Sequence, residues 1–121
     1  MYRLGIIEES LDNHDILNVI GKFLYSQRIA EVPEDEVPIW HINEYHVPDS
    51  ELVGFLPLLE KHVKPAWYVH AFNEEKLYVV LQGRSFCISR EKDDSWNEMI
   101  EYGVKSAGVE RHYLENISLS I

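Results

Sequence analysis

This chain of 121 residues contains six histidines, which are the first candidates for a chemical role. Histidine changes charge near neutral pH, so it serves both acid–base catalysis and metal binding. His41 lies directly after Trp40, and His70 lies three residues after Trp67, each on a segment that alternates like a β-strand. If these two strands are neighbours in a sheet, both imidazoles can lie on one face together with tyrosine hydroxyls.

A ligand pocket around this histidine pair is one hypothesis for function. The histidines would exchange protons with a bound molecule, and an arginine would hold an anionic group. The candidate ligand-binding residues are His41, Tyr45, Tyr68, His70, Arg84 and Arg90. No catalytic residue can be assigned, because the sequence contains no phosphate-binding glycine loop and no GxSxG, HExxH or CxxC motif.

The sequence predicts neither a metal site nor a nucleophilic cysteine. Zinc needs three or four ligands, whereas His41 and His46 are an odd number of residues apart on one strand and point to opposite faces. Cys87 alternates with Ser85 and Ser89 on a strand; a histidine could still lie close to it in space, but no nucleophile elbow or helix N-terminus is present to activate it. We interpret Cys87 as a small strand residue and expect no cofactor.

The charge balance excludes several classes of partner. Lysine and arginine number 11 against 21 aspartates and glutamates, a formal net charge of −10. Such a chain is repelled by nucleic acids and anionic membranes, so we expect neither as a partner. The N-terminal sequence does not resemble a signal peptide, and one cysteine cannot form an internal disulfide. We therefore expect a cytoplasmic protein with a single domain over residues 1–121.

The stretch from Trp67 to Arg90 predicts the centre of the fold. Three runs rich in aromatic and β-branched residues are separated by two turn signals, Asn73–Lys76 and Gln82–Arg84. The second signal contains Gly83, the residue that a tight turn favours. This pattern predicts an antiparallel meander of three strands.

The first part of the chain predicts two further strands and a helix. Arg3–Glu9 reads as a strand, and Ser10 or Asp12 can cap a following helix. Residues 26–32 are compatible with a loop or a short strand, and the acidic segment Pro33–Pro38 is a loop. Ile39–Val47 alternates over its whole length, which predicts a long strand.

The remaining segments predict two helices and a last strand. Asp49 can cap a helix that Pro57 should kink or divide, and Pro65 should end it. Residues 95–98 have the spacing of a capping box and should begin the third helix. Apolar and polar residues alternate from Leu114 to Ile121, which predicts a strand at the edge of the sheet.

Together these elements predict an α+β fold in the order β-α-β-α-β-β-β-α-β, with helices packed on a mixed, largely antiparallel sheet. The first meander strand directs Tyr68, His70 and Phe72 to one face and apolar residues to the other. Either helices and a loop cover both faces, or one face presents aromatic side chains to a partner.

Part of the chain also resembles a known family. The relevant residues are Trp67, Tyr68, Phe72 and Asn73, then Tyr78–Val80, Phe86 and Arg90, and finally Glu101–Gly103 and Gly108. This arrangement is similar to a family of small bacterial proteins of unassigned function, with a WY-x-x-F hairpin and a helix that ends in YG-x-x-x-G. In this chain the two glycines are one residue further apart. The resemblance implies a compact cytoplasmic domain and transfers no catalytic residue.

Two hypotheses for function follow. The first is a non-enzymatic interaction module that self-associates, as a homodimer, through the C-terminal edge strand or the aromatic sheet face. The second is a small-molecule binder or small enzyme whose pocket lies between the sheet and Pro33–Pro38.

Overall fold

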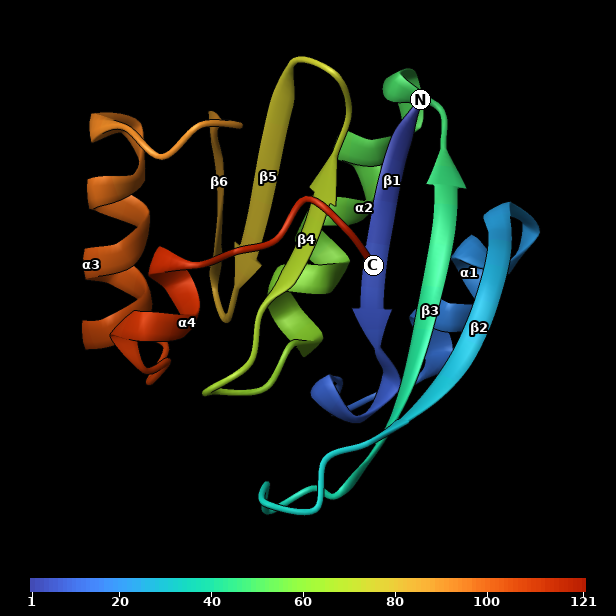
Figure 1. The fold of residues 1–121 in the computed structure, drawn as a ribbon. Helices are drawn as coiled ribbons and strands as arrows, with labels where there is room; N and C mark the ends of the chain where they lie inside the picture. Colours follow the sequence, from blue (N-terminus) through green and yellow to red (C-terminus); the bar gives the residue numbers. More distant parts are fainter.

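The computed structural model describes residues 1–121 and confirms the α+β fold class. Six strands form one antiparallel sheet in the order β2-β3-β1-β4-β5-β6 (Figure 1). The strands are β1 (Tyr2–Ile7), β2 (Leu24–Glu31), β3 (Ile39–Val47), β4 (Val69–Phe72), β5 (Lys76–Leu81) and β6 (Arg84–Ser89). The helices are α1 (Asp15–Ile20), α2 (Asp49–His62), α3 (Asn97–Lys105) and α4 (Arg111–Glu115).

The predicted meander is confirmed as β4, β5 and β6. Strands β5 and β6 are joined by Gln82 and Gly83, with Leu81 paired to Arg84 across the turn. Gly83 has a φ of 87°, a left-handed conformation that other residues adopt at a cost. A Cβ atom at this position would also lie 2.9 Å from the hydroxyl of Tyr102. Both observations explain why the turn contains glycine.

Two hydrophobic cores lie on opposite faces of the sheet. We call the first the α2 face, because α1 and α2 pack there over β1, β3 and β4 with residues such as Ile20, Leu52 and Leu4. We call the other the α3 face, because α3 and α4 pack there over β5 and β6. Figure 1 shows α1 and α2 behind the sheet and α3 beside β6. The α3 face of β1, β3 and β2 therefore carries no helix.

The predicted C-terminal strand is wrong. Residues 111–115 form α4, and residues 116–121 have no regular structure but cross the α3 face towards β1 (Figure 1). Ile117 is buried and Leu119 and Ile121 are half-buried, so the alternation does mark an inward-facing side. An extended segment lying on a sheet face gives the same two-residue period as an edge strand, which is why the pattern misled.

The order of elements differs from the prediction in a second place. Residues 24–31, which overlap the segment left open as loop or strand, form β2, so the order is β-α-β-β-α-β-β-β-α-α. Helix α2 is continuous through Pro57, which is exposed, so the helix is not divided there. None of the helices is long and apolar enough for a membrane span.

The helix starts also differ from the predicted caps. Helix α1 begins at Asp15, whose N–H donates to Asn13 Oδ1 at 2.8 Å, while the hydroxyl of Ser10 donates to the Ile7 carbonyl. Before α3, the Asp93 carboxylate accepts the N–H of Ser95 at 2.9 Å. Asp93 thus caps the 3-10 turn that precedes α3, and α2 begins at Asp49 itself, so none of the predicted residues is an N-cap with a side-chain hydrogen bond.

Candidate interaction surface

The proposed pairing of His41 with His70 is wrong, because the two side chains point to opposite faces. Strand β1 lies between β3 and β4, and Gly5 is opposite both Glu44 and His70. Residues opposite one another share a face. His70 therefore lies on the α3 face with Glu44, and His41, three positions from Glu44, lies on the α2 face.

The other four candidate residues lie in separate environments. Tyr45 is 2% exposed in the core of the α2 face, and its hydroxyl accepts a hydrogen bond from Asn43. Tyr68 is half-buried against the core of the α3 face. The Arg84 guanidinium pairs with Glu98 on α3 at 2.7 Å, and Arg90 donates to the carbonyl of Glu74. The six residues do not line a common pocket.

Two depressions in the surface lie away from the predicted pocket. One has a volume of about 380 Å³ and is lined by Glu74, Glu75, Ser89, Arg90, Glu91 and Leu119. The second, of about 220 Å³, is lined by Met1, Arg3, Phe72, Asn73, Glu74 and Arg90. The acidic loop Pro33–Pro38 lines neither, because it lies at the tip of the β2–β3 hairpin, beyond the end of β1 (Figure 1).

The most distinctive surface is the outer edge of β2. This strand pairs with β3 on one side and with no strand on the other. Seven of its eight residues are exposed, including Leu24 at 42%, Tyr25 at 66% and Ile29 at 65%. A long edge strand with large apolar side chains is available for pairing with another strand.

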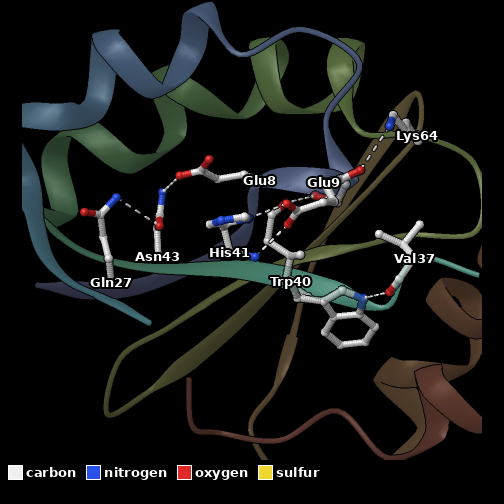
Figure 2. Close-up of polar contacts among 10 residues, drawn as sticks. Glu8, Glu9, Gln27, Val37, Trp40, His41, Asn43 and Lys64 are labelled. Carbon is white, nitrogen blue, oxygen red and sulfur yellow. Dashed lines mark hydrogen bonds and ion pairs between the residues drawn. The ribbon is translucent and has the colours of Figure 1, made fainter. Parts of the chain in front are cut away.

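A clamp between Glu9 and His41 holds the β2–β3 hairpin against the rest of the fold (Figure 2). One carboxylate oxygen of Glu9 accepts the backbone N–H of His41 at 2.7 Å, and the other lies 2.6 Å from Nδ1 of its ring. Lys64 Nζ donates to the carbonyl of Glu9 at 3.1 Å. The hairpin is thereby fixed where it extends past β1.

The electrostatics of the clamp favour the charged pair. The hydrogen bond and negative charge of Glu9 raise the pKa of His41. Partial burial pushes the pKa of Glu9 upward, but the hydrogen bonds from the backbone and ring of His41 outweigh it, and the pKa is lowered. Because His41 faces solvent, the pair orients the hairpin more than it stabilises the fold.

A buried polar network supports the same hairpin. Asn43 is 2% exposed, and its amide nitrogen donates to Glu8 Oε2 and to the hydroxyl of Tyr45, both at 2.9 Å. Gln27 Nε2 on β2 donates to Asn43 Oδ1 at 3.3 Å (Figure 2). With its partners satisfied, Asn43 links β2, β3 and the turn after β1 and has no free group for a ligand.

The uncovered α3 face carries a second polar cluster. The carboxylate of Glu44 is 8% exposed and accepts Nε of Arg3 at 2.9 Å, and it lies 2.6 Å from Nε2 of His46. The hydrogen bond from Arg3 lowers the pKa of Glu44. The Tyr25 ring stacks on His46 with 3.9 Å between centroids, so this edge presents an aromatic side chain to solvent.

Comparison with known proteins adds no relative: no protein-family model, curated protein or solved structure matches the chain. The resemblance of residues 67–108 to a bacterial family therefore stays a prediction. Sequence analysis missed the β2 edge; its large apolar residues, Leu24 and Tyr25 just before the segment left open and Ile29 within it, do not alternate regularly.

Proposed function

We propose that this protein is a non-enzymatic interaction module that forms a homodimer by antiparallel pairing of β2 with β2 of a second copy. The observation that carries the proposal is the open edge of β2, which combines unpaired backbone groups with exposed Leu24, Tyr25 and Ile29. Main-chain hydrogen bonds give affinity in such strand addition, and side chains give specificity. This replaces the C-terminal edge strand as the interface.

The hydrogen bonding of β2 restricts the register. The N–H of Val32 donates to the carbonyl of Pro38 at 2.7 Å, so it points towards the β3 side of the hairpin. Backbone groups alternate in direction along an antiparallel strand, so those of Gln27, Ile29 and Glu31 point outward. A two-fold axis at Ile29 pairs Ile29 with Ile29 of the second copy and Gln27 with its Glu31.

Side-chain charge favours this register over its neighbour. An axis at Arg28 would place two guanidinium groups opposite each other, which destabilises a strand pair. With the axis at Ile29, Arg28 faces Ala30 of the second copy, and the two exposed isoleucines bury each other. The interface gains apolar burial without placing two like charges directly opposite each other.

The same register brings opposite charges together at the ends of the interface. Beyond the ends of β2, this register directs the acidic loop of one copy towards the start of β2 in the other copy. Glu34 and Glu36 form no ion pair in their own chain, and neither does Lys22. The acidic loop facing Lys22 offsets part of the repulsion between two chains of net charge −10.

Absolute mass by size exclusion with light scattering tests the proposal. We expect the wild-type protein to approach twice its chain mass of 14.2 kDa as concentration rises. Ile29→Lys places two ammonium groups at the two-fold axis and should weaken the dimer about a hundredfold. Val53→Lys is the matched control, because Val53 is 57% exposed on α2, and it should leave the dimer intact.

Two outcomes would contradict the proposal. A wild-type protein that stays monomeric at all concentrations removes a second copy as the occupant of the edge. An Ile29→Lys variant that associates as the wild type does moves the interface elsewhere. Circular dichroism of both variants establishes that they are folded.

We also infer that the protein works in the cytoplasm of a bacterium. Cys87 is a free, exposed thiol, and an oxidising compartment would couple it to other thiols. The light-scattering measurement is therefore made with reductant. A dimer that disappears on adding reductant would be a disulfide product of Cys87 and would count against strand pairing.

A further inference from the structure

The C-terminal segment, residues 116–121, lies as a strap on the α3 face of the sheet (Figure 1). It has no strand ladder with the sheet, and its side chains attach it through Ile117, Leu119 and Ile121. The alternating polar residues of the strap, Asn116, Ser118 and Ser120, are exposed. A segment held in this way can leave the sheet without breaking a strand pair.

A glycine in the middle of the sheet makes room for the end of the strap. A Cβ atom on Gly5 would lie 3.0 Å from Cγ1 and 3.2 Å from Cδ1 of Ile121, and 3.1 Å from Cε1 of His70. Side-chain contacts this short are rarely tolerated. Gly5 is therefore a seat for Ile121, beside the imidazole of His70.

His70 is a titratable group that forms a hydrogen bond to the backbone of the strap. Its Nε2 lies 3.2 Å from the carbonyl of Ser120, a bond that neutral imidazole can donate. The ring is flanked by Tyr68, just before β4, and by Phe72 on β4, with centroids 6.1 and 5.6 Å away. Burial among these side chains lowers the pKa of His70; the hydrogen bonds to the backbone of Ser120 and Ser118 oppose this shift, the positive charge of Arg3 adds to it, and the net pKa is lowered.

We propose that residues 116–121 are a pH-sensitive strap, closed over His70 while its imidazole is neutral and released when the imidazole is protonated. The charged group facing the ring from β1 is Arg3, and Tyr68, just before β4, is neutral in this range. The strap contributes carbonyl groups, and Val79, opposite on β5, is apolar. The Glu44 carboxylate is already engaged by Arg3 and so offers no free counter-charge.

Release of the strap would change the surface of the sheet. Tyr68, His70 and Phe72 form a row on the α3 face of β4, and β1 separates them from the uncovered part of β3 and β2. Without the strap, this row becomes continuous with the uncovered face. The aromatic sheet face expected from the sequence would then be exposed at acidic pH and closed at neutral pH. This inference does not depend on pairing of β2.

The sign of the pH dependence follows from the lowered pKa. In the released state His70 has an ordinary pKa of about 6.5, whereas in the closed state it is lower. The closed state therefore binds fewer protons, and it loses stability as pH falls below about 6.5. Until pH reaches the pKa of the closed state, the ratio of released to closed molecules should rise by up to about tenfold per pH unit.

Methyl NMR spectra of the full chain test the strap. In the closed state, the Cδ1 methyl group of Ile121 and the imidazole of His70 both lie next to Gly5, so this methyl group should have a ring-current-shifted resonance. We expect this resonance to move to the position of an exposed isoleucine between about pH 7.5 and about pH 5, on either side of the ordinary histidine pKa. His70→Gln should keep the strap closed at both values, because the amide donates a hydrogen bond but does not titrate. His112→Gln, at an exposed position on α4, should respond as the wild type.

Two results would overturn the inference. Ile121 resonances that do not move in the wild-type protein exclude release, and equal movement in His70→Gln excludes His70 as the switch. Gly5→Ala gives an independent measurement if His70→Gln does not fold. It should displace Ile121 already at neutral pH, and an unchanged Ile121 resonance in that variant would show that Gly5 is not its seat. The Ile29→Lys variant should repeat the wild-type titration, which separates the strap from dimer formation.

Discussion

The two edge strands of the sheet, β2 and β6, occupy equivalent positions but are protected very differently. On β6, Phe86 and Ile88 are 8% and 6% exposed. Trp96 closes the end of that strand, because its indole N–H donates to the carbonyl of Ser89 at 2.8 Å. The N–H of Ser89 donates to Ser95 Oγ at 3.0 Å. On β2 no residue is buried.

The difference separates an edge that belongs to the fold from an edge that is available to a partner. Folded proteins usually cover, shorten or charge their edge strands to prevent association. The chain does this on β6, which is short and closed by a turn of helix, and does not do it on β2, which is longer and carries Tyr25 and Ile29. We therefore expect mutations on β6 to affect stability and mutations on β2 to affect association.

The largest expected effect on the free energy of unfolding comes from shortening a buried side chain on β6. Phe86→Ala removes a buried ring that packs against Tyr102, and it should lower the free energy of unfolding by about 3 kcal/mol. Ile29→Ala on β2 should cost less than about 0.5 kcal/mol in the monomer, because the side chain is 65% exposed. Urea denaturation at a protein concentration too low for association measures both. Equal losses of unfolding free energy would mean that side chains on β2 contribute as much to the stability of the fold as those on β6.

A smaller effect is expected where β6 is closed. Trp96→Phe keeps an aromatic ring in the core but removes the indole N–H that satisfies the Ser89 carbonyl. The loss should be about 1 to 2 kcal/mol, the range for a hydrogen bond whose buried partner is left unsatisfied. Trp40→Phe is a matched control, since its indole donates to the carbonyl of Val37 in the exposed hairpin. If Trp40→Phe lowers the free energy of unfolding as much as Trp96→Phe does, the loss in Trp96→Phe does not come from the hydrogen bond at the end of β6.

The alternation of apolar and polar residues correctly predicted the strands that bury one face and expose the other. Strand β3 matches the predicted range, Ile39–Val47, and the meander follows the predicted turns, because half-buried strands alternate clearly. Strand β2 gave no such pattern, since both of its faces are exposed and no alternation is required. Because β2 is exposed, its sequence did not predict a strand. The same exposure makes the edge of β2 a candidate for association.

The predicted site failed for a different reason. Whether His41 and His70 share a face depends on which strands are neighbours, and β1 enters the sheet between β3 and β4 from the start of the chain. The partner that His41 actually has, Glu9, is likewise distant in sequence. Local alternation correctly places Tyr68, His70 and Phe72 on one face, but it does not reveal that the strap covers them.

The smallest effect is expected in the clamp that positions β2. The raised pKa of His41 means that its contribution to stability is complete below about pH 6.5 and is lost as pH rises through that raised pKa. The lowered pKa of Glu9 means that its contribution is complete above about pH 4.5 and is lost as pH falls. Urea midpoints of the wild type and His41→Gln should therefore differ most between these two values and converge outside them. His14→Gln, at an exposed position without an ion pair, should show no such window, and a His41→Gln difference independent of pH would leave the clamp without a role in holding the hairpin.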